Sequence, residues 1–118
     1  MKNVRLAVAA LVLVALVVLS FQTTSRSASA VPPVPCTTAS LGQAFGGQFH
    51  LSSIQNYGCE GSWAFVWATV GSGEQAIGVT EVLAYSTNAQ RWAIVSRATD
   101  CKASILPSVV YRQGCFSN

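Results

Sequence analysis

The stretch SWAFVWATV, residues 62–70, is the clearest strand signal in this chain of 118 residues. Aromatic and β-branched residues dominate it, and these residue types favour the pleated surface of a sheet. The glycines of residues 71–73 predict a turn into a second long strand over residues 76–86. A reversal centred on residues 88–89 leads to a third strand over residues 91–98. The sequence therefore predicts an antiparallel meander, in which each strand pairs with the next.

Two pairings set the register of these strands, Val70 opposite Ile77 and Thr87 opposite Gln90. Opposed residues of antiparallel strands share a face, and alternate residues share a side. One face then collects an apolar, mostly aliphatic set, with a direct Tyr85–Trp92 pair: Ala64, Val66, Ala68, Val70, Ile77, Val79, Leu83, Tyr85, Trp92 and Ile94. The other face carries the rings of Trp63, Phe65 and Trp67. We expect helices to cover the first of these, the aliphatic face.

A fourth strand and two helices complete the predicted fold. A weaker alternation predicts the strand over residues 48–57, followed by a turn at residues 58–61. Thr37 or Thr38 can cap a short helix over residues 39–45. The second helix is predicted over residues 108–113, closed by the glycine at position 114. Both helices are expected on one side of the sheet.

Glu81 conflicts with this arrangement, because it falls within the aliphatic face, opposite Ser96. A buried carboxylate without a partner is costly. Three alternatives therefore stay open: Glu81 has a partner, the register is off by one residue, or the helices cover the aromatic face instead.

Four cysteines, Cys36, Cys59, Cys101 and Cys115, lie at spacings of 23, 42 and 14 residues. An even number in a short exported chain predicts two disulfides, for which 3 pairings are possible. We favour Cys36–Cys59 with Cys101–Cys115, because each bridge then fastens a terminal segment to the centre. Structural zinc sites usually draw on closely spaced cysteine pairs, so we predict no metal and no cofactor.

Residues 1–30 have the pattern of a secretory signal peptide. Lys2 and Arg5 form a positive start, and residues 6–19 are an unbroken apolar run of 14. The small residues at positions 28–30 (ASA) suit cleavage by a signal peptidase. A membrane-spanning helix needs about 20 apolar residues, so we expect cleavage after residue 30 and no stable membrane anchor. An uncleaved anchor stays the alternative.

Residues 31–118 then form a single small secreted domain that begins with a proline-rich lead-in over residues 31–35. Three of the seven basic residues (Lys2, Arg5 and Arg26) precede it, so its four basic side chains balance the four acidic ones. A neutral domain lacks the clustered positive charge that nucleic acid binding requires. We therefore predict no nucleic acid partner. From the signal-peptide pattern we predict secretion from a bacterial cell, with the cell wall as one destination.

Few residues are available for catalysis. His50 is the single histidine, and no motif supplies the exposed nucleophile that a Ser-His-Asp or Cys-His site would need. A glycosidase would need two carboxylates about 5–9.5 Å apart. The candidates are Glu60, Glu74, Glu81 and Asp100. We predict that the protein is not an enzyme; a small hydrolase using Glu60, Asp100 or Glu81, or a structural envelope component, stays the alternative.

Trp63, Phe65 and Trp67 alternate along one strand, with Arg91 and Arg97 two strands away. Tryptophan and arginine dominate protein interfaces, and arginine over tryptophan adds cation–π attraction. These five residues are therefore the candidate partner-binding surface, for an extracellular protein or for a cell-wall glycan whose sugars would stack on the rings. Alternatively the rings form the core, which we expect for at least two of the three.

A further pattern runs through residues 36–118. It consists of Cys59-Glu60-Gly61-Ser62-Trp63-Ala64, then Trp92, Arg97, Cys101, Pro107 and the ending Cys115-Phe116-Ser117-Asn118. This pattern resembles small secreted disulfide-containing proteins of actinobacteria. The resemblance implies secretion and disulfide pairing, and it implies no activity or site residues, because such proteins are described mainly as secreted.

Together these features predict an α+β domain: an antiparallel meander sheet of three or four strands with short terminal helices, stapled by two disulfides. Its expected function is that of a secreted, non-enzymatic binding protein. An inhibitor of an extracellular hydrolase is one version, because a rigid, stapled domain loses little entropy on docking.

Overall fold

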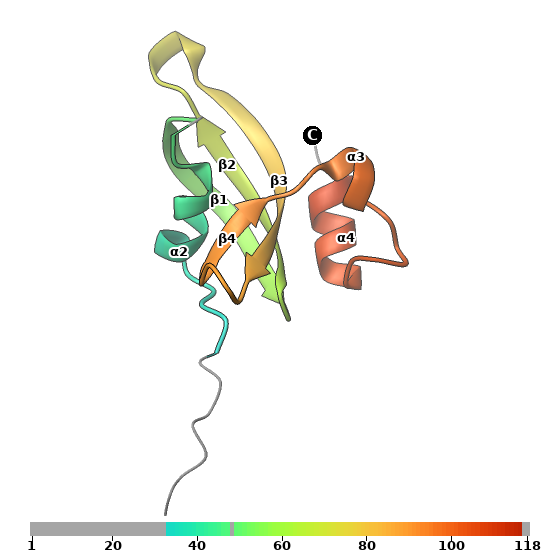
Figure 1. The fold of residues 1–118 in the computed structure, drawn as a ribbon. Coiled ribbons are helices and arrows are strands. Elements are labelled where there is room, and N and C mark those ends of the chain that lie inside the picture. The colour runs from blue at the N-terminus through green and yellow to red at the C-terminus, as the bar shows by residue number, and fades with distance from the viewer. Residues whose placement is uncertain (1–32, 48, 117–118) are drawn as a thin grey trace, which may run out of the picture. The chain divides into compact units, whose positions relative to one another are not determined.

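A four-stranded antiparallel sheet in the order β1-β2-β3-β4 is the centre of the fold (Figure 1). The strands are β1 (Leu51–Glu60), β2 (Trp63–Val70), β3 (Ile77–Ser86) and β4 (Arg91–Ile94). The structure, a computed structural model, describes residues 33–47 and 49–116. The predicted signal peptide, residues 1–30, lies outside the described residues. Each strand pairs with the next in sequence, so the predicted meander is confirmed.

Short helices lie before the sheet, within it and after it. They are α2 (Thr38–Gly42), the 3-10 helices η1 (Gln43–Phe45) and η2 (Gly73–Gln75), α3 (Arg97–Asp100) and α4 (Ser108–Cys115). The predicted α+β class with short terminal helices is confirmed.

Both predicted registers are confirmed. Val70 lies opposite Ile77 between β2 and β3, and Tyr85 lies opposite Trp92 between β3 and β4. The Tyr85 and Trp92 rings meet edge to face with their centroids 5.3 Å apart, a favourable arrangement for an aromatic pair. The two turns therefore fix which side chains share a face across three strands.

The turn between β1 and β2 lies later than predicted. Residues 58–60 belong to β1, and the chain reverses at Gly61, whose φ of 60° suits glycine at the first central position of a tight hairpin turn. Gly58 has a packing role instead, because a Cβ there would lie 2.6 Å from Cε1 of Phe65. The ring of Phe65 thus covers the glycine of the neighbouring strand, as aromatic residues do for glycines in sheets.

Strand β4 is shorter than predicted and ends at Ile94 rather than at residue 98. The chain turns instead into α3, where the Ser96 carbonyl accepts hydrogen bonds from the amides of Thr99 and Asp100, at 3.1 and 2.9 Å. Local helical hydrogen bonds have replaced sheet pairing here, and the alternation of side chains carried no sign of this change.

Helices cover both faces of the sheet, which corrects the expectation that they lie on one side. On the aliphatic face, Leu41 and Phe45 from α2 and η1 belong to one buried cluster with Ala64, Val66, Ala68, Val70, Leu83 and Trp92. On the other face, Val110 of α4 clusters with Phe65 and Val82. Figure 1 shows α2 and α4 on opposite sides of the sheet. The aromatic face also carries large apolar side chains, so both faces need cover from water.

The N-terminus of α2 is fixed by a capping box. Thr37 is the N-cap, one of the two predicted candidates. Its Oγ1 accepts a hydrogen bond from the Ser40 amide at 3.1 Å, and Ser40 Oγ accepts one from the Thr37 amide at 3.2 Å. The cap sets where the helix begins, and Leu41 is then fully buried against the sheet.

Gly114 lies inside α4 and does not end it, contrary to the prediction. A Cβ at this position would lie 2.7 Å from Cγ2 of Val82 and 3.3 Å from Cβ of Phe65. Glycine at position 114 therefore allows α4 to approach the sheet closely.

Both favoured disulfides are present. Cys36–Cys59 fastens the segment before α2 to the end of β1, and Cys101–Cys115 fastens the end of α3 to the end of α4. Two disulfides in a small domain indicate an oxidising environment. In residues 33–47 and 49–116 we find no helix with the length and apolar character needed to cross a membrane.

Gly114→Ala should lower the free energy of unfolding by roughly 1–3 kcal/mol, because the added methyl group overlaps the buried Val82. Urea unfolding followed by circular dichroism measures the change. Gly78→Ala is the matched control, since a Cβ at Gly78 meets nothing within 4 Å. It should leave the stability unchanged or raise it. Equal stability of Gly114→Ala and the native protein would contradict the close packing of α4.

Replacing Cys101 and Cys115 together with serine should lower the free energy of unfolding by roughly 3 kcal/mol. The disulfide closes a loop with a sequence separation of 14, and without it the unfolded chain gains conformational freedom. The urea midpoint of the double variant, compared with that of the native protein under oxidising conditions, checks this. An unchanged midpoint would show that packing alone holds α4.

Candidate functional site

The predicted row of aromatic rings does not form an open surface. Phe65 is 4% exposed and lies in the core beneath α4, where a partner cannot reach it. Trp63 and Trp67 are half-buried and pack against the same cluster. The Nε1–H of Trp67 also donates to the Gln113 carbonyl of α4, at 2.8 Å. Phe65 is thus part of the core, and Trp63 and Trp67 pack at its edge.

Arg97 is also held within the fold. Its Nη1 and Nη2 atoms donate to the Thr80 carbonyl at 3.4 Å and to the Cys115 carbonyl at 3.1 Å. Cys115 is the last residue of α4, so the guanidinium lies at the negative end of the helix dipole. The half-buried Arg97 therefore connects β3, α3 and α4.

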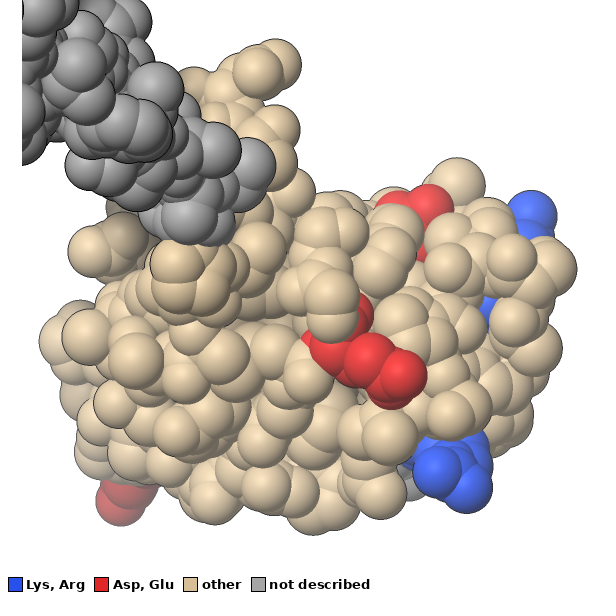
Figure 2. All heavy atoms as spheres, turned by 90° about the horizontal axis from the view of Figure 1, so that it is seen from below, with Lys and Arg blue, Asp and Glu red and all other residues tan. Residues whose placement is uncertain are grey.

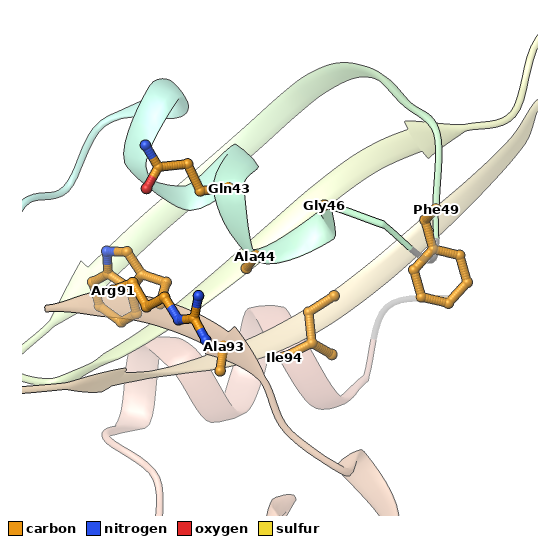
Figure 3. A pocket seen from close by; sticks show the side chains of 8 residues that line it. Gln43, Ala44, Gly46, Phe49, Arg91, Ala93 and Ile94 are labelled. Carbon is orange, nitrogen blue, oxygen red and sulfur yellow. The ribbon is translucent and has the colours of Figure 1, made fainter. Parts of the chain in front are cut away.

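Arg91, by contrast, is exposed and borders an open hollow of about 390 Å³ between η1 and β4 (Figure 3). The residues that line the hollow are Gln43, Ala44, Gly46, Phe49, Arg91, Trp92, Ala93 and Ile94. Its volume falls within the range of ligand sites in proteins. Of the five predicted contact residues, it is Arg91 that borders this concave surface.

The hollow has a polar end and an apolar end. Figure 3 shows Arg91 and Gln43 toward one end and Phe49 at the other, with Ile94 between them. Phe49 is 47% exposed, so its ring is open to a ligand. A ligand that combines an apolar group with a negative charge would match both ends.

The tryptophan at the base of the hollow is held firmly. Trp92 is 2% exposed and contacts the ring of Tyr85. Its Nε1–H donates to the Pro35 carbonyl at 2.7 Å. Pro35 directly precedes Cys36, whose disulfide reaches β1. The site is therefore formed before a ligand binds, which reduces the entropy lost on binding.

Sequence reasoning missed Phe49, Gln43 and Ala44 as site residues. The predicted strand over residues 48–57 includes Phe49, but Phe49 precedes β1, and its amide donates to the Phe45 carbonyl at 3.3 Å. The hollow arises because η1 and β4 meet in space, although they lie far apart in the chain. Arg91 was the one residue of the hollow that the sequence offered as a candidate.

Two of the acidic candidates for catalysis lie far apart in the fold. Glu60 lies at the turn between β1 and β2, and Glu74 lies in η2, at the opposite end of the sheet. These two carboxylates could not act as a pair. Figure 2 shows the charged side chains of one face in small separate groups on a mostly uncharged surface. Within the described ranges, no group of three or more histidine, cysteine, aspartate or glutamate side chains could hold a metal ion.

Glu81 is half-buried on the aliphatic face, opposite Val66. Burial raises the pKa of its carboxyl group above the ordinary value, and the positive charge of Arg97 lowers that pKa in part. The observed pairing excludes a slipped register. Glu81 is therefore accommodated by partial exposure and by the opposite charge of Arg97.

Comparison with known proteins gives no match for this chain among protein-family models, curated proteins or solved structures. The interpretation of the site accordingly depends on its own residues and geometry.

Glu81→Gln should stabilise the protein at neutral pH. Because burial raises the pKa of the folded carboxyl, folding favours its protonated form. Stability from this group is complete below the pKa of the unfolded carboxyl and is lost as pH rises through the folded pKa. The advantage of the variant, measured as a shift in urea midpoint, should therefore grow from acid to neutral pH. Glu74→Gln, at an exposed position, is the control, and a shift independent of pH would contradict the prediction.

Proposed function

We propose that this protein is an exported, non-enzymatic binding protein whose hollow between η1 and β4 contacts a partner protein outside the cell. The observation that carries the proposal is the hollow, with its exposed Phe49 and Arg91. Aromatic and arginine side chains supply most of the binding energy at protein interfaces. Export is supported by the signal-peptide pattern of residues 1–30 and by the two disulfides.

The burial of the aromatic rings on β2 favours a protein partner over a cell-wall glycan. Sugars stack on open aromatic faces. Phe65 is in the core, and Trp63 and Trp67 pack against the cluster beneath α4. The hollow itself offers a single exposed ring, Phe49, with the cation of Arg91 at its other end. Such a site suits a segment with mixed apolar and charged side chains better than a row of sugars.

The rigidity of the site supports binding as its task. Trp92 is fixed by Pro35 and Tyr85, and the disulfides fasten both terminal segments. A preformed surface loses little conformational entropy on docking, so more of the contact energy appears as affinity. Inhibition of an extracellular hydrolase is one form that this function can take.

Phe49→Ser combined with Arg91→Glu should reduce capture of the natural partner by about tenfold or more, because both ends of the hollow are changed. The full-length chain, tagged at its C-terminus and exported by a bacterial host, is cross-linked in culture fluid and cell-wall fractions. Quantitative mass spectrometry compares the captured proteins.

The matched control is Ile77→Ser with Lys102→Glu, which also changes one exposed apolar residue and one exposed cation, both outside the hollow. It should capture the partner as the native protein does. Equal capture by the two double variants would contradict the proposed site. Retention of both in the cell wall without a protein partner would indicate an envelope component instead.

A further inference from the structure

On the basis of the proposed function, we infer that the hollow receives an extended, acidic segment of the partner protein. In this segment one large apolar side chain is followed directly by a carboxylate. The segment lies along the free edge of β4 and pairs with it as an added antiparallel strand.

The N–H and C=O groups of Ile94 point away from β3, toward the open edge of the sheet. The Val95 amide donates to the Val82 carbonyl at 2.9 Å, and residues of an antiparallel ladder alternate in the neighbour that they bond. Val95 and Ala93 therefore bond β3, whereas Ile94 and Trp92 present their N–H and C=O groups at the outer edge. Trp92 is 2% exposed, so the half-buried Ile94 is the residue with which a further strand can pair. Open strand edges bind extended peptides in this way.

Pairing at Ile94 directs one side chain of the segment into the hollow. The residue opposite Ile94 shares its face, which is the face that η1 covers. There the side chain meets Ala44 and Phe49 as well as Ile94. Because these walls are apolar, a large aliphatic or aromatic side chain is favoured at this position.

On the added strand, the residue directly after the apolar one lies opposite Ala93, and its side chain points to the other face of the sheet. Figure 3 shows the side chain of Arg91 extending along β4 toward Ala93. Among the described residues that line the hollow, Arg91 is the only charged one. A carboxylate at the position opposite Ala93 therefore meets an opposite charge, and no acidic residue in the described lining of the hollow competes for it.

The other edge of the sheet is less suited to strand addition. In β1 the register shifts between Leu51 and Ser53 and again between Ile54 and Asn56. Such irregularities interrupt the row of edge hydrogen-bonding groups and protect an edge from pairing. Strand β4 pairs with β3 in unbroken register and adjoins the hollow.

Fluorescence anisotropy with the full-length exported protein and defined peptides tests this inference. The labelled peptide Ser-Thr-Glu-Leu-Glu-Thr-Ser should bind. A peptide with lysine in place of both glutamates should bind at least about tenfold more weakly, and so should one methylated at the leucine nitrogen. Arg91→Glu should reverse the preference between the acidic and basic peptides. Lys102→Glu, at an exposed position outside the hollow, should leave it unchanged.

Equal affinity for the acidic and basic peptides, or for the methylated and unmethylated ones, would overturn the inference. Suppose that the natural partner is lost from the variant Phe49→Ser, Arg91→Glu, while neither peptide binds the native protein. The proposed function then stands and the acidic strand is wrong. Analytical ultracentrifugation tests a second copy of the chain as the occupant. A dimer that is lost in Arg91→Glu and is not dissociated by the acidic peptide would overturn the inference.

Discussion

The burial of strand β2 on both of its faces is the constraint on which the rest of the fold depends. Ala64 and Val66 are fully buried on one face of the strand. Phe65, which lies between them in sequence and points to the other face, is 4% exposed. Antiparallel sheets commonly leave one face to water. Here both faces need cover, and the described segments outside the sheet are short. Each face therefore takes the helical segment from one end of the domain.

Neither helical cover could hold its structure alone. α2 has 5 residues and α4 has 8, well below the roughly 12–15 at which isolated helices become stable in water. Packing and the disulfides supply the rest. Cys36 directly precedes the N-cap Thr37, and Cys115 is the last residue of α4. Each disulfide thus fastens one end of a helix and helps to keep that helix packed against the sheet.

Local sequence was enough to predict the pairing of β2, β3 and β4, but it could not predict what covers the sheet. The turns at residues 71–73 and 88–89, with the alternation between them, determined the pairing of three strands. The row beginning at Trp63 suits a core and a surface equally well, so its cover by α4 had no local sign. Gly114 likewise indicates a helix end when the sequence alone is considered. Its packing role becomes visible only in the structure, where α4 lies against Val82. The hollow depends on contact between η1 and β4, which no local pattern encodes.

The early end of β4 connects the scaffold to the candidate site. The chain leaves the sheet after Ile94, and Arg97 then fixes the new direction through Thr80 and Cys115. A longer β4 would present a longer row of unpaired backbone groups, which promotes aggregation. The short edge leaves Ile94 as the accessible pairing residue, and its backbone groups do not distinguish one partner sequence from another. Partner choice must therefore come from the side chains around it, and the chain places a cation and an exposed ring there.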